Sequence, residues 1–305
     1  MSSADAAPRP ATSRRGQLKR LENRFGFLLA IPALIAFCVV ILYPFLQAML
    51  LSLYKYTLFT PEPVWVAFDN FAAFFRSPQL MESWLTTIIF VTITTGVTFI
   101  LGLAWALLMD QPFAGRTLVR SASLLPWVLP STVTAFLWMW MFNAQYGVIN
   151  ALLVNLGIIA SPIPWLSTPN GALAGIVIAK TWLSVPLFMA FFLAGLQSLS
   201  RDQVEAARVD GANNLHVLRY IVMPHLKHTM MIVLVLGAMG NLQQFDVIYA
   251  MTGGGPVRAT TVLSIEVYRQ AFQNWNIGMA ATVGVLWFAT IAPPAFIYLR
   301  SLFRS

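Results

Sequence analysis

Long apolar segments alternate with short polar connections along most of this 305-residue chain. Six of these segments carry almost no charge and are long enough to cross a bilayer: residues 26–50, 85–109, 121–142, 172–196, 229–245 and 277–299. A helix satisfies its own backbone hydrogen bonds in lipid. The pattern therefore predicts an all-α, polytopic membrane protein with six transmembrane helices. Segment 229–245 rises only about 26 Å, so we expect its helix to extend past one end.

The composition agrees with this prediction. Hydrophobic residues make up 58% of the chain, charged residues 10%, and the mean hydropathy is +0.71. A soluble domain carries about a quarter charged residues.

The basic residues lie mainly on one side of the expected membrane. Fourteen Lys and Arg residues fall in the N-terminal arm, the 110–120 and 197–228 loops and the C-terminus, whereas Lys55, Arg76, Arg258 and Arg269 are expected on the other side. Cytoplasmic loops carry such an excess, so we expect both termini and the 197–228 loop in the cytoplasm. The rule also accounts for the net charge of +8. Nucleic acid is a poor candidate partner, because the basic residues are scattered over membrane edges.

The predicted spans and loops divide the chain into three parts. Residues 1–24, rich in Ala, Pro, Ser and Arg, predict a disordered cytoplasmic arm. Residues 25–83 form the first transmembrane helix and an external loop; the apolar run is too long for a signal peptide. Residues 84–305 form a five-helix core. Its external stretch 143–171 has no charge, and either faces a partner or lies at the bilayer edge.

The loop at about 200–224 has its own helix signals. Ser200 can cap a helix, with Gln203 closing a capping box, and Gly211 suits the left-handed position that ends a helix. A second short helix follows, with Leu215, Leu218 and Ile221 or Val222 at helical spacing, and Pro224 is expected to open the next span. The small residues Ala206, Ala207 and Ala212 fit a docking surface for another protein.

The spacing of this loop resembles a known family motif. Glu205-Ala206-Ala207, Gly211, Ile221 and Pro224 are similar to the EAA loop of ABC importer permeases. The flanking stretches 193–197 (LAGLQ), 245–248 (FDVI) and 252–256 (TGGGP) resemble the sugar-permease branch, so the likeness covers roughly residues 80–300. Met223 replaces the usual Leu, a swap that conserves volume.

This resemblance implies a role and partners. The chain would form half of the pore of a sugar importer in the bacterial inner membrane, beside a sister permease, two cytoplasmic ATPase subunits and an external sugar-binding protein. The residues implied to couple it to the ATPase are Glu205, Ala206, Ala207, Asp210, Gly211, Ile221 and Pro224. ATP and magnesium would be bound by the ATPase subunits, and no cofactor is expected in this chain.

The sequence lacks the motifs of an ATPase or of another enzyme, which agrees with a transport subunit whose ATPase is a separate chain. None of the four lysines stands in a G-x-x-x-x-G-K-[ST] phosphate loop. Cys38 is the single cysteine, and neither a metal cluster nor a Ser/His/Asp set can be assembled. We therefore expect a transport subunit rather than an enzyme. An ion-coupled secondary transporter and, less plausibly, an intramembrane enzyme stay as alternatives.

The expected sugar path contains polar residues inside two spans. Lys180 lies in the fourth span, where it faces a cavity or extends its ammonium toward the external headgroups. Asn241 and Gln244, three apart, are expected to share a helix face, either toward the sugar or in interhelical hydrogen bonds. Likeness to maltose-importer permeases implies a path along Lys180, Ser184, Gly237, Asn241 and Gln244. Gly237 and Gly240 permit either close helix packing or an irregular turn.

The cargo is left open by these residues. Lys180 and Gly237 differ in chemistry from the maltose-importer relatives. The overall likeness is to trehalose-importing permeases, which predicts a disaccharide such as trehalose.

Overall fold

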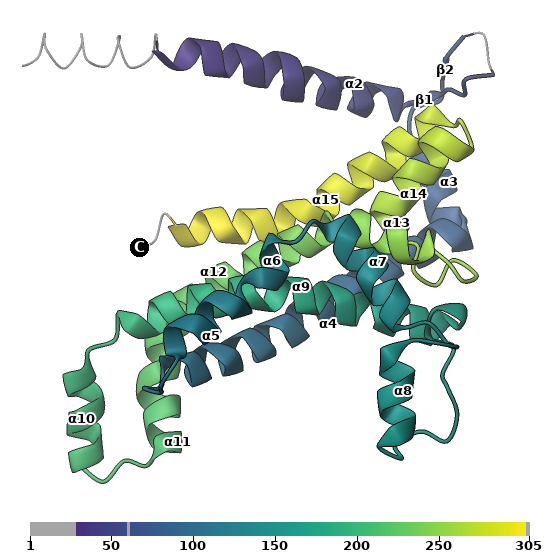
Figure 1. Cartoon of the computed structure of the whole chain (residues 1–305). Coiled ribbons are helices and arrows are strands. Elements are labelled where there is room, and N and C mark those ends of the chain that lie inside the picture. The colour runs from purple at the N-terminus through teal and green to yellow at the C-terminus, as the bar shows by residue number, and fades with distance from the viewer. Residues whose placement is uncertain (1–28, 60–61, 303–305) are drawn as a thin grey trace, which may run out of the picture.

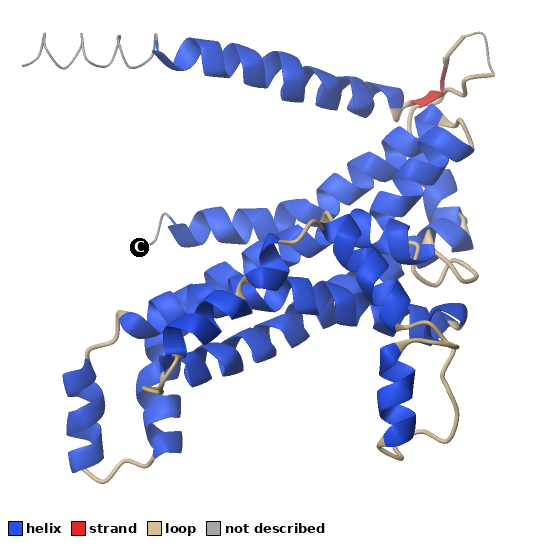
Figure 2. Ribbon diagram, in the orientation of Figure 1, coloured by secondary structure: helices blue, strands red, loops and turns tan. Residues whose placement is uncertain are grey.

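The computed structural model describes residues 29–59 and 62–302, so the expected arm at 1–24 lies outside the described residues. The described chain is almost entirely helical. Its strands are the two-residue pair β1 (Tyr54–Lys55) and β2 (Val64–Trp65), which pair in an antiparallel register (Figure 2). The predicted all-α fold is confirmed.

Five helical stretches are long and apolar enough to cross a membrane. They are Leu29–Leu51, which contains η1 (Cys38–Leu42) and α2 (Tyr43–Leu51); α4 (Pro78–Asp110); α9 (Pro169–Gln197); Asn214–Leu242, which contains α11 (Asn214–Val217), η3 (Leu218–Val222) and α12 (Met223–Leu242); and α15 (Ile277–Leu302), which is apolar over Ile277–Phe296. The five stretches match predicted spans one, two, four, five and six.

The third predicted span is broken. Residues 121–142 were expected to form one helix, but α5 (Arg116–Ser123) and α6 (Leu125–Val128) meet α7 (Ser131–Met141) at 97°. Leu129 has an extended backbone with ψ 140°, as the residue before a proline tends to have. Pro130 continues this extended path with ψ 134°. Counted as one bent span, this pair gives the sixth crossing.

The fifth span extends backward to Asn214, which confirms the predicted extension past one end. It ends at Leu242 rather than at residue 245, and Pro224 lies inside this helical path instead of opening it. One wide turn precedes the proline, in which the N–H of Met223 donates to the carbonyl of Leu218. A proline ring clashes with the carbonyl four residues earlier, and a π turn relieves that crowding. The same arrangement, Tyr43 N–H to the Cys38 carbonyl, precedes Pro44.

The long helices form a bundle around α9. It runs along α4 and contacts α12, which in turn packs on α4 and α15 (Figure 1). One buried cluster includes Phe90, Trp138 and Ile176, and a second includes Phe188 and Leu226. The first span diverges from this bundle and contacts α15 through α2.

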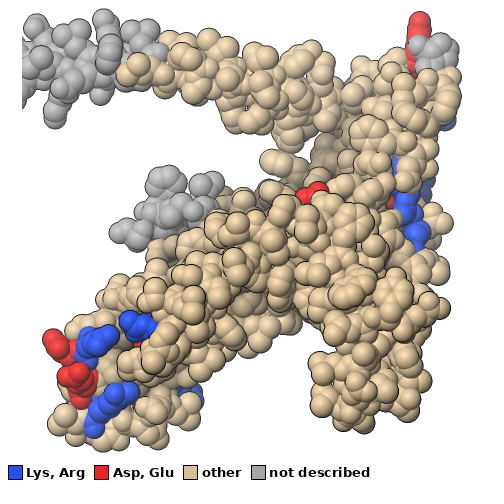
Figure 3. Space-filling view, in the orientation of Figure 1, with Lys and Arg blue, Asp and Glu red and all other residues tan. Residues whose placement is uncertain are grey.

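The ends of these helices fall into two groups. The start of the first span, α10 (Arg201–Val209), α11 and the end of α15 lie on the left in Figure 1. The opposite end carries the β1–β2 pair and a set of short elements. These are α3 (Asp69–Arg76), α8 (Val148–Asn155), η2 (Trp165–Ser167), α13 (Asp246–Thr252), α14 (Leu263–Tyr268) and η4 (Arg269–Gln273). Charged side chains in Figure 3 gather near these two ends, and most of the coloured surface between them is uncharged, as a bilayer requires.

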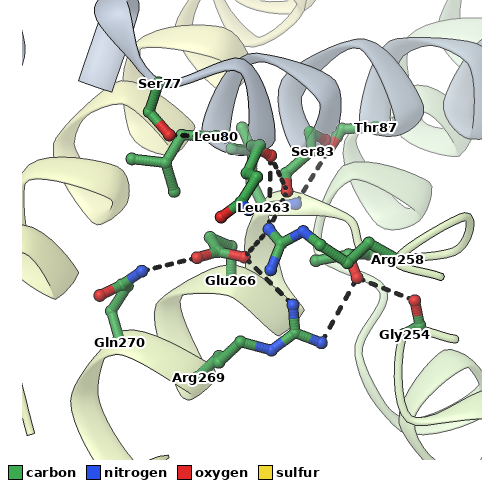
Figure 4. A network of polar contacts seen from close by, with 12 residues as sticks. Ser77, Leu80, Ser83, Thr87, Gly254, Arg258, Leu263, Glu266, Arg269 and Gln270 are labelled. Atoms are coloured by element: carbon green, nitrogen blue, oxygen red, sulfur yellow. Dashed lines mark hydrogen bonds and ion pairs between the residues drawn. The ribbon is translucent and has the colours of Figure 1, made fainter. Parts of the chain in front are cut away.

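A buried carboxylate fastens the 253–273 region to α4 (Figure 4). Glu266, 1% exposed, accepts a hydrogen bond from Arg258 at 2.6 Å and one from Gln270 at 2.7 Å, and Arg269 lies 3.6 Å away. Arg258 also donates to the Ser83 hydroxyl of α4 at 3.1 Å. A buried acid is tolerated when it is paired and hydrogen-bonded in this way.

The uncharged stretch after α7 folds back on itself around Asn150. This buried side chain donates to the carbonyl of Ile163 at 2.9 Å and accepts from the N–H of Ile163 at 3.1 Å. It also accepts from the indole of Trp165 at 3.0 Å. One amide thereby closes the loop that carries α8, which projects from the bundle in Figure 1.

Candidate functional site

A cavity of about 460 Å³ lies among α6, α7, α9 and α12. Its polar lining comes from Ser131, Lys180, Ser184 and Asn241, and Trp127 and Leu129 line it beside the bend of the third span. The remaining wall is apolar and includes Phe188, Phe191 and Leu236.

The structure brings four of the five predicted path residues together. Lys180, Ser184, Gly237 and Asn241 line the cavity, whereas Gln244 is not part of its lining. The expectation that Asn241 and Gln244 share a helix face is wrong, because α12 ends at Leu242. Gln244 is buried beyond that end, where its backbone carbonyl accepts a hydrogen bond from Ser264 at 2.6 Å.

Lys180 is held by the middle of α9 and is half-buried. It makes no hydrogen bond or ion pair with any residue that the structure describes, and its side chain lines the cavity. An ammonium at this depth requires water, a counter-charge or a ligand. The cavity therefore contains a hydrogen-bond donor that is free to meet a bound molecule.

Asn241 has a structural partner as well as a place in the lining. Its amide donates to the Thr95 hydroxyl of α4 at 2.9 Å, so it joins two helices. The alternative of interhelical bonding thus holds for the amide nitrogen, while the residue also borders the cavity.

Gly237 shapes the cavity wall. A Cβ at this position would overlap the ring of Phe188, so the absence of a side chain lets α9 and α12 approach closely. Gly240, one turn later, has no described atom within 4 Å of a Cβ position. Close packing accounts for the first glycine and not for the second.

Sequence reasoning missed the contribution of the broken span. Trp127, Leu129 and Ser131 enter the cavity because the chain turns between α6 and α7. The signal was present in Pro126 and Pro130, which interrupt an otherwise continuous apolar segment. Discontinuous helices often mark binding sites in transporters.

The predicted coupling loop forms a second candidate site, at the opposite end of α9 and α12 from α13. Gly211 has φ +89° and ends α10, as predicted. The predicted capping box is wrong: Ser200 is the N-cap but its side chain makes no capping bond. The next helix is capped instead by Asn213, which accepts from the N–H of His216 at 2.9 Å.

This loop is mostly accessible. Glu205, Ala206, Asp210, Gly211 and Pro224 are exposed, whereas Ala207 and Ile221 are half-buried.

Apolar side chains are exposed beside these residues. Val209 is 87% exposed and Leu215 69% exposed. Leu215 thus points away from the bundle, and Val217 and Val222 are the buried residues of the second short helix. Glu205 makes no ion pair with the described residues. An exposed apolar surface with an unpaired carboxylate is suited to protein docking.

The match to a known protein family agrees with this arrangement. The model of the family "binding-protein-dependent transport system inner membrane component" matches residues 98–301. The chain belongs to this family. The resemblance to ABC importer permeases that the loop indicated is thereby confirmed.

Two relatives are similar over nearly their whole length. The trehalose/maltose transport system permease protein MalF of Thermococcus litoralis is 33% identical, with 93% of this chain and 95% of the relative covered. The sulfoquinovosyl glycerol transport system permease protein SmoG of Agrobacterium fabrum is 32% identical, with 92% and 90% covered.

A solved structure shares the fold. A chain of a bacterial ABC transporter involved in the import of the acidic polysaccharide alginate matches with a TM-score of 0.78 at 20% identity. The match covers 95% of this chain and 98% of that chain.

Proposed function

We propose that this chain is the membrane-spanning permease subunit of an ATP-driven, binding-protein-dependent importer that carries a sugar, with a disaccharide such as trehalose as its cargo. The observation that supports this most is the cavity between α9 and α12, the two helices that flank the coupling loop. Hydroxyl, amide and ammonium groups there lie beside aromatic rings. Sugar hydroxyls pair with such polar groups while C–H faces pack on rings.

The size of the cavity is compatible with this cargo. Its volume of about 460 Å³ falls in the range of about 300–1,000 Å³ for small-molecule sites. The two relatives, a trehalose/maltose permease and a sulfoquinovosyl glycerol permease, also favour a glycoside as the cargo.

The partners follow from the same proposal. Two cytoplasmic ATPase subunits bind ATP and magnesium, a sister permease completes the pore, and an external sugar-binding protein delivers the cargo. A solved relative of this fold was obtained in complex with a pentasaccharide-bound periplasmic protein, which supports the last of these partners. The complex resides in the bacterial inner membrane, with both termini of this chain in the cytoplasm.

The coupling loop provides the contact with the ATPase. Glu205 is exposed and has no described ion-pair partner, so it is available for a charge-assisted hydrogen bond to a basic group. Ala206 and Ala207 allow close approach, and Gly211 sets the turn between the two short helices.

The proposal is tested with the complex purified through a tag on this chain and reconstituted into vesicles. We expect uptake of labelled trehalose that needs ATP on the coupling-loop side and binding protein on the other. Uptake on an ion gradient without ATP would establish the secondary-transporter alternative. Recovery of a chemically altered sugar would establish the enzyme alternative.

A further inference from the structure

A basic side chain, Lys180, lines the cavity, and an acidic side chain, Asp246, adjoins it through a lining residue. Ser131, a lining residue, donates a hydrogen bond to the carboxylate of Asp246 at 3.1 Å. Asp246 also exerts an attractive electrostatic effect on Lys180, another lining residue. No direct ion pair joins Lys180 to Asp246 in the described residues, so the two charges lie near each other without neutralising each other by contact.

The elements that hold these groups are fixed by packing. Lys180 belongs to α9, Ser131 opens α7 at the 97° bend, and Asp246 opens α13, which packs against both α7 and α9. The N-terminal end of α7 favours a negative charge at this position. Asp246 is exposed, and its second carboxylate oxygen makes no hydrogen bond with the described residues.

Two separated opposite charges, an ammonium and a carboxylate, suit a neutral molecule that carries several hydroxyls. One hydroxyl can accept from the ammonium while another donates to the carboxylate, and both bonds are charge-assisted. An anionic ligand gains an attraction to Lys180 but meets repulsion from Asp246. The pair has no net charge, so it gives no preference to an acidic sugar.

We propose that Asp246 is a specificity-determining residue, and that its carboxylate and the Lys180 ammonium together select a neutral, polyhydroxylated sugar. The inference rests on the proposed function for the identity of the cavity as the sugar path. It adds Asp246 and Ser131 to that path and assigns the charge of the cargo.

The test is equilibrium dialysis of the purified complex against labelled trehalose and against a disaccharide that contains glucuronic acid. For Asp246→Asn we expect trehalose to bind at least about tenfold more weakly, the loss of one charged hydrogen bond. The ratio of acidic-disaccharide to trehalose affinity should rise about tenfold, because the cavity then carries one uncompensated positive charge. For Lys180→Gln that ratio should fall.

Asp69→Asn is the matched control, since Asp69 also opens a short helix, α3, but accepts no hydrogen bond from a residue that lines the cavity in the described chain. Its affinities should stay within about twofold of the parent.

Trehalose binding by the parent with an unchanged ratio in both cavity variants would overturn the inference alone. Binding of neither sugar by the parent would overturn the proposed cargo and this inference with it. Should Asp246→Asn not assemble, Asp246→Ser is measured in its place: a raised ratio of acidic-disaccharide to trehalose affinity supports the inference, and an unchanged ratio overturns it.

Discussion

At the scale of single residues, α12 contains two glycines with different reasons to be there. Gly237 leaves room for the Phe188 ring, whereas no described atom lies near a Cβ at Gly240. Phe188 is itself part of the cavity wall. The contact between Gly237 and the Phe188 ring therefore sets the distance between α9 and α12 beside the cavity.

We predict that Gly237→Ala lowers stability by about 1–3 kcal/mol, because the added methyl overpacks against Phe188. Gly240→Ala should be neutral or raise stability by about 0.5–1 kcal/mol, because alanine is the better helix former. Thermal unfolding of the purified complex in detergent measures both. Phe188→Leu should rescue Gly237→Ala, and equal effects of the two alanines would contradict the packing account.

At the scale of elements, the coupling loop and the cavity share one helical path. The helix from Asn214 to Leu242 carries Ile221 and Pro224 near its start and Gly237 and Asn241 near its end. Gly211, with φ +89°, sets the direction in which this path leaves α10.

We predict that Gly211→Trp leaves the protein in the membrane but lowers sugar-stimulated ATP hydrolysis at least about tenfold, since a bulky side chain obstructs the docking surface. Gly115→Trp is the control, because Gly115 also has a positive φ, +80°, and open surroundings, but lies in another loop. Co-purification of the ATPase at normal yield with unchanged stimulation in Gly211→Trp would contradict the coupling role.

Much of this architecture could be predicted from sequence because it depends on local chemistry. Apolar length identified the spans, and Gly211 identified a helix end. The bend at Leu129–Pro130 was missed, since apolar residues continue across it and hydropathy does not detect a change of direction. The pairing of Ser131 with Asp246 joins positions 115 residues apart, and no local pattern reports such a contact. The end of α12 at Leu242 was also missed. Gln243 and Gln244 follow Asn241 closely in the sequence, and their amides were interpreted as a continuation of the same polar helix face.

At the scale of the whole molecule, the described ends of the chain and the coupling loop lie on the same side, the left in Figure 1. The asymmetry of Lys and Arg predicts that this shared end is cytoplasmic. Ser167, next to α9, lies at the opposite end and is exposed, as is Asn213 in the coupling loop.

We predict that, in a Cys38→Ser background, Ser167→Cys reacts with a membrane-impermeant thiol reagent added outside intact cells, whereas Asn213→Cys does not. After permeabilisation Asn213→Cys should react, which controls for its accessibility. Labelling of Asn213→Cys in intact cells would reverse the orientation and remove the coupling role of the loop.

The wide turn before Pro224 has a mechanical consequence. Beyond it, the helix extends about 25 Å to Asn241, at 1.5 Å per residue, without another proline. We expect this part of the helix to tilt as a rigid body about the π turn, where the helical hydrogen bonding is weaker. A tilt of about 5° at this turn moves the far end by about 2 Å over that length. That displacement separates a hydrogen-bonded pair from a broken one, so under the proposed function we expect a small rotation at the coupling loop to release a sugar from Asn241.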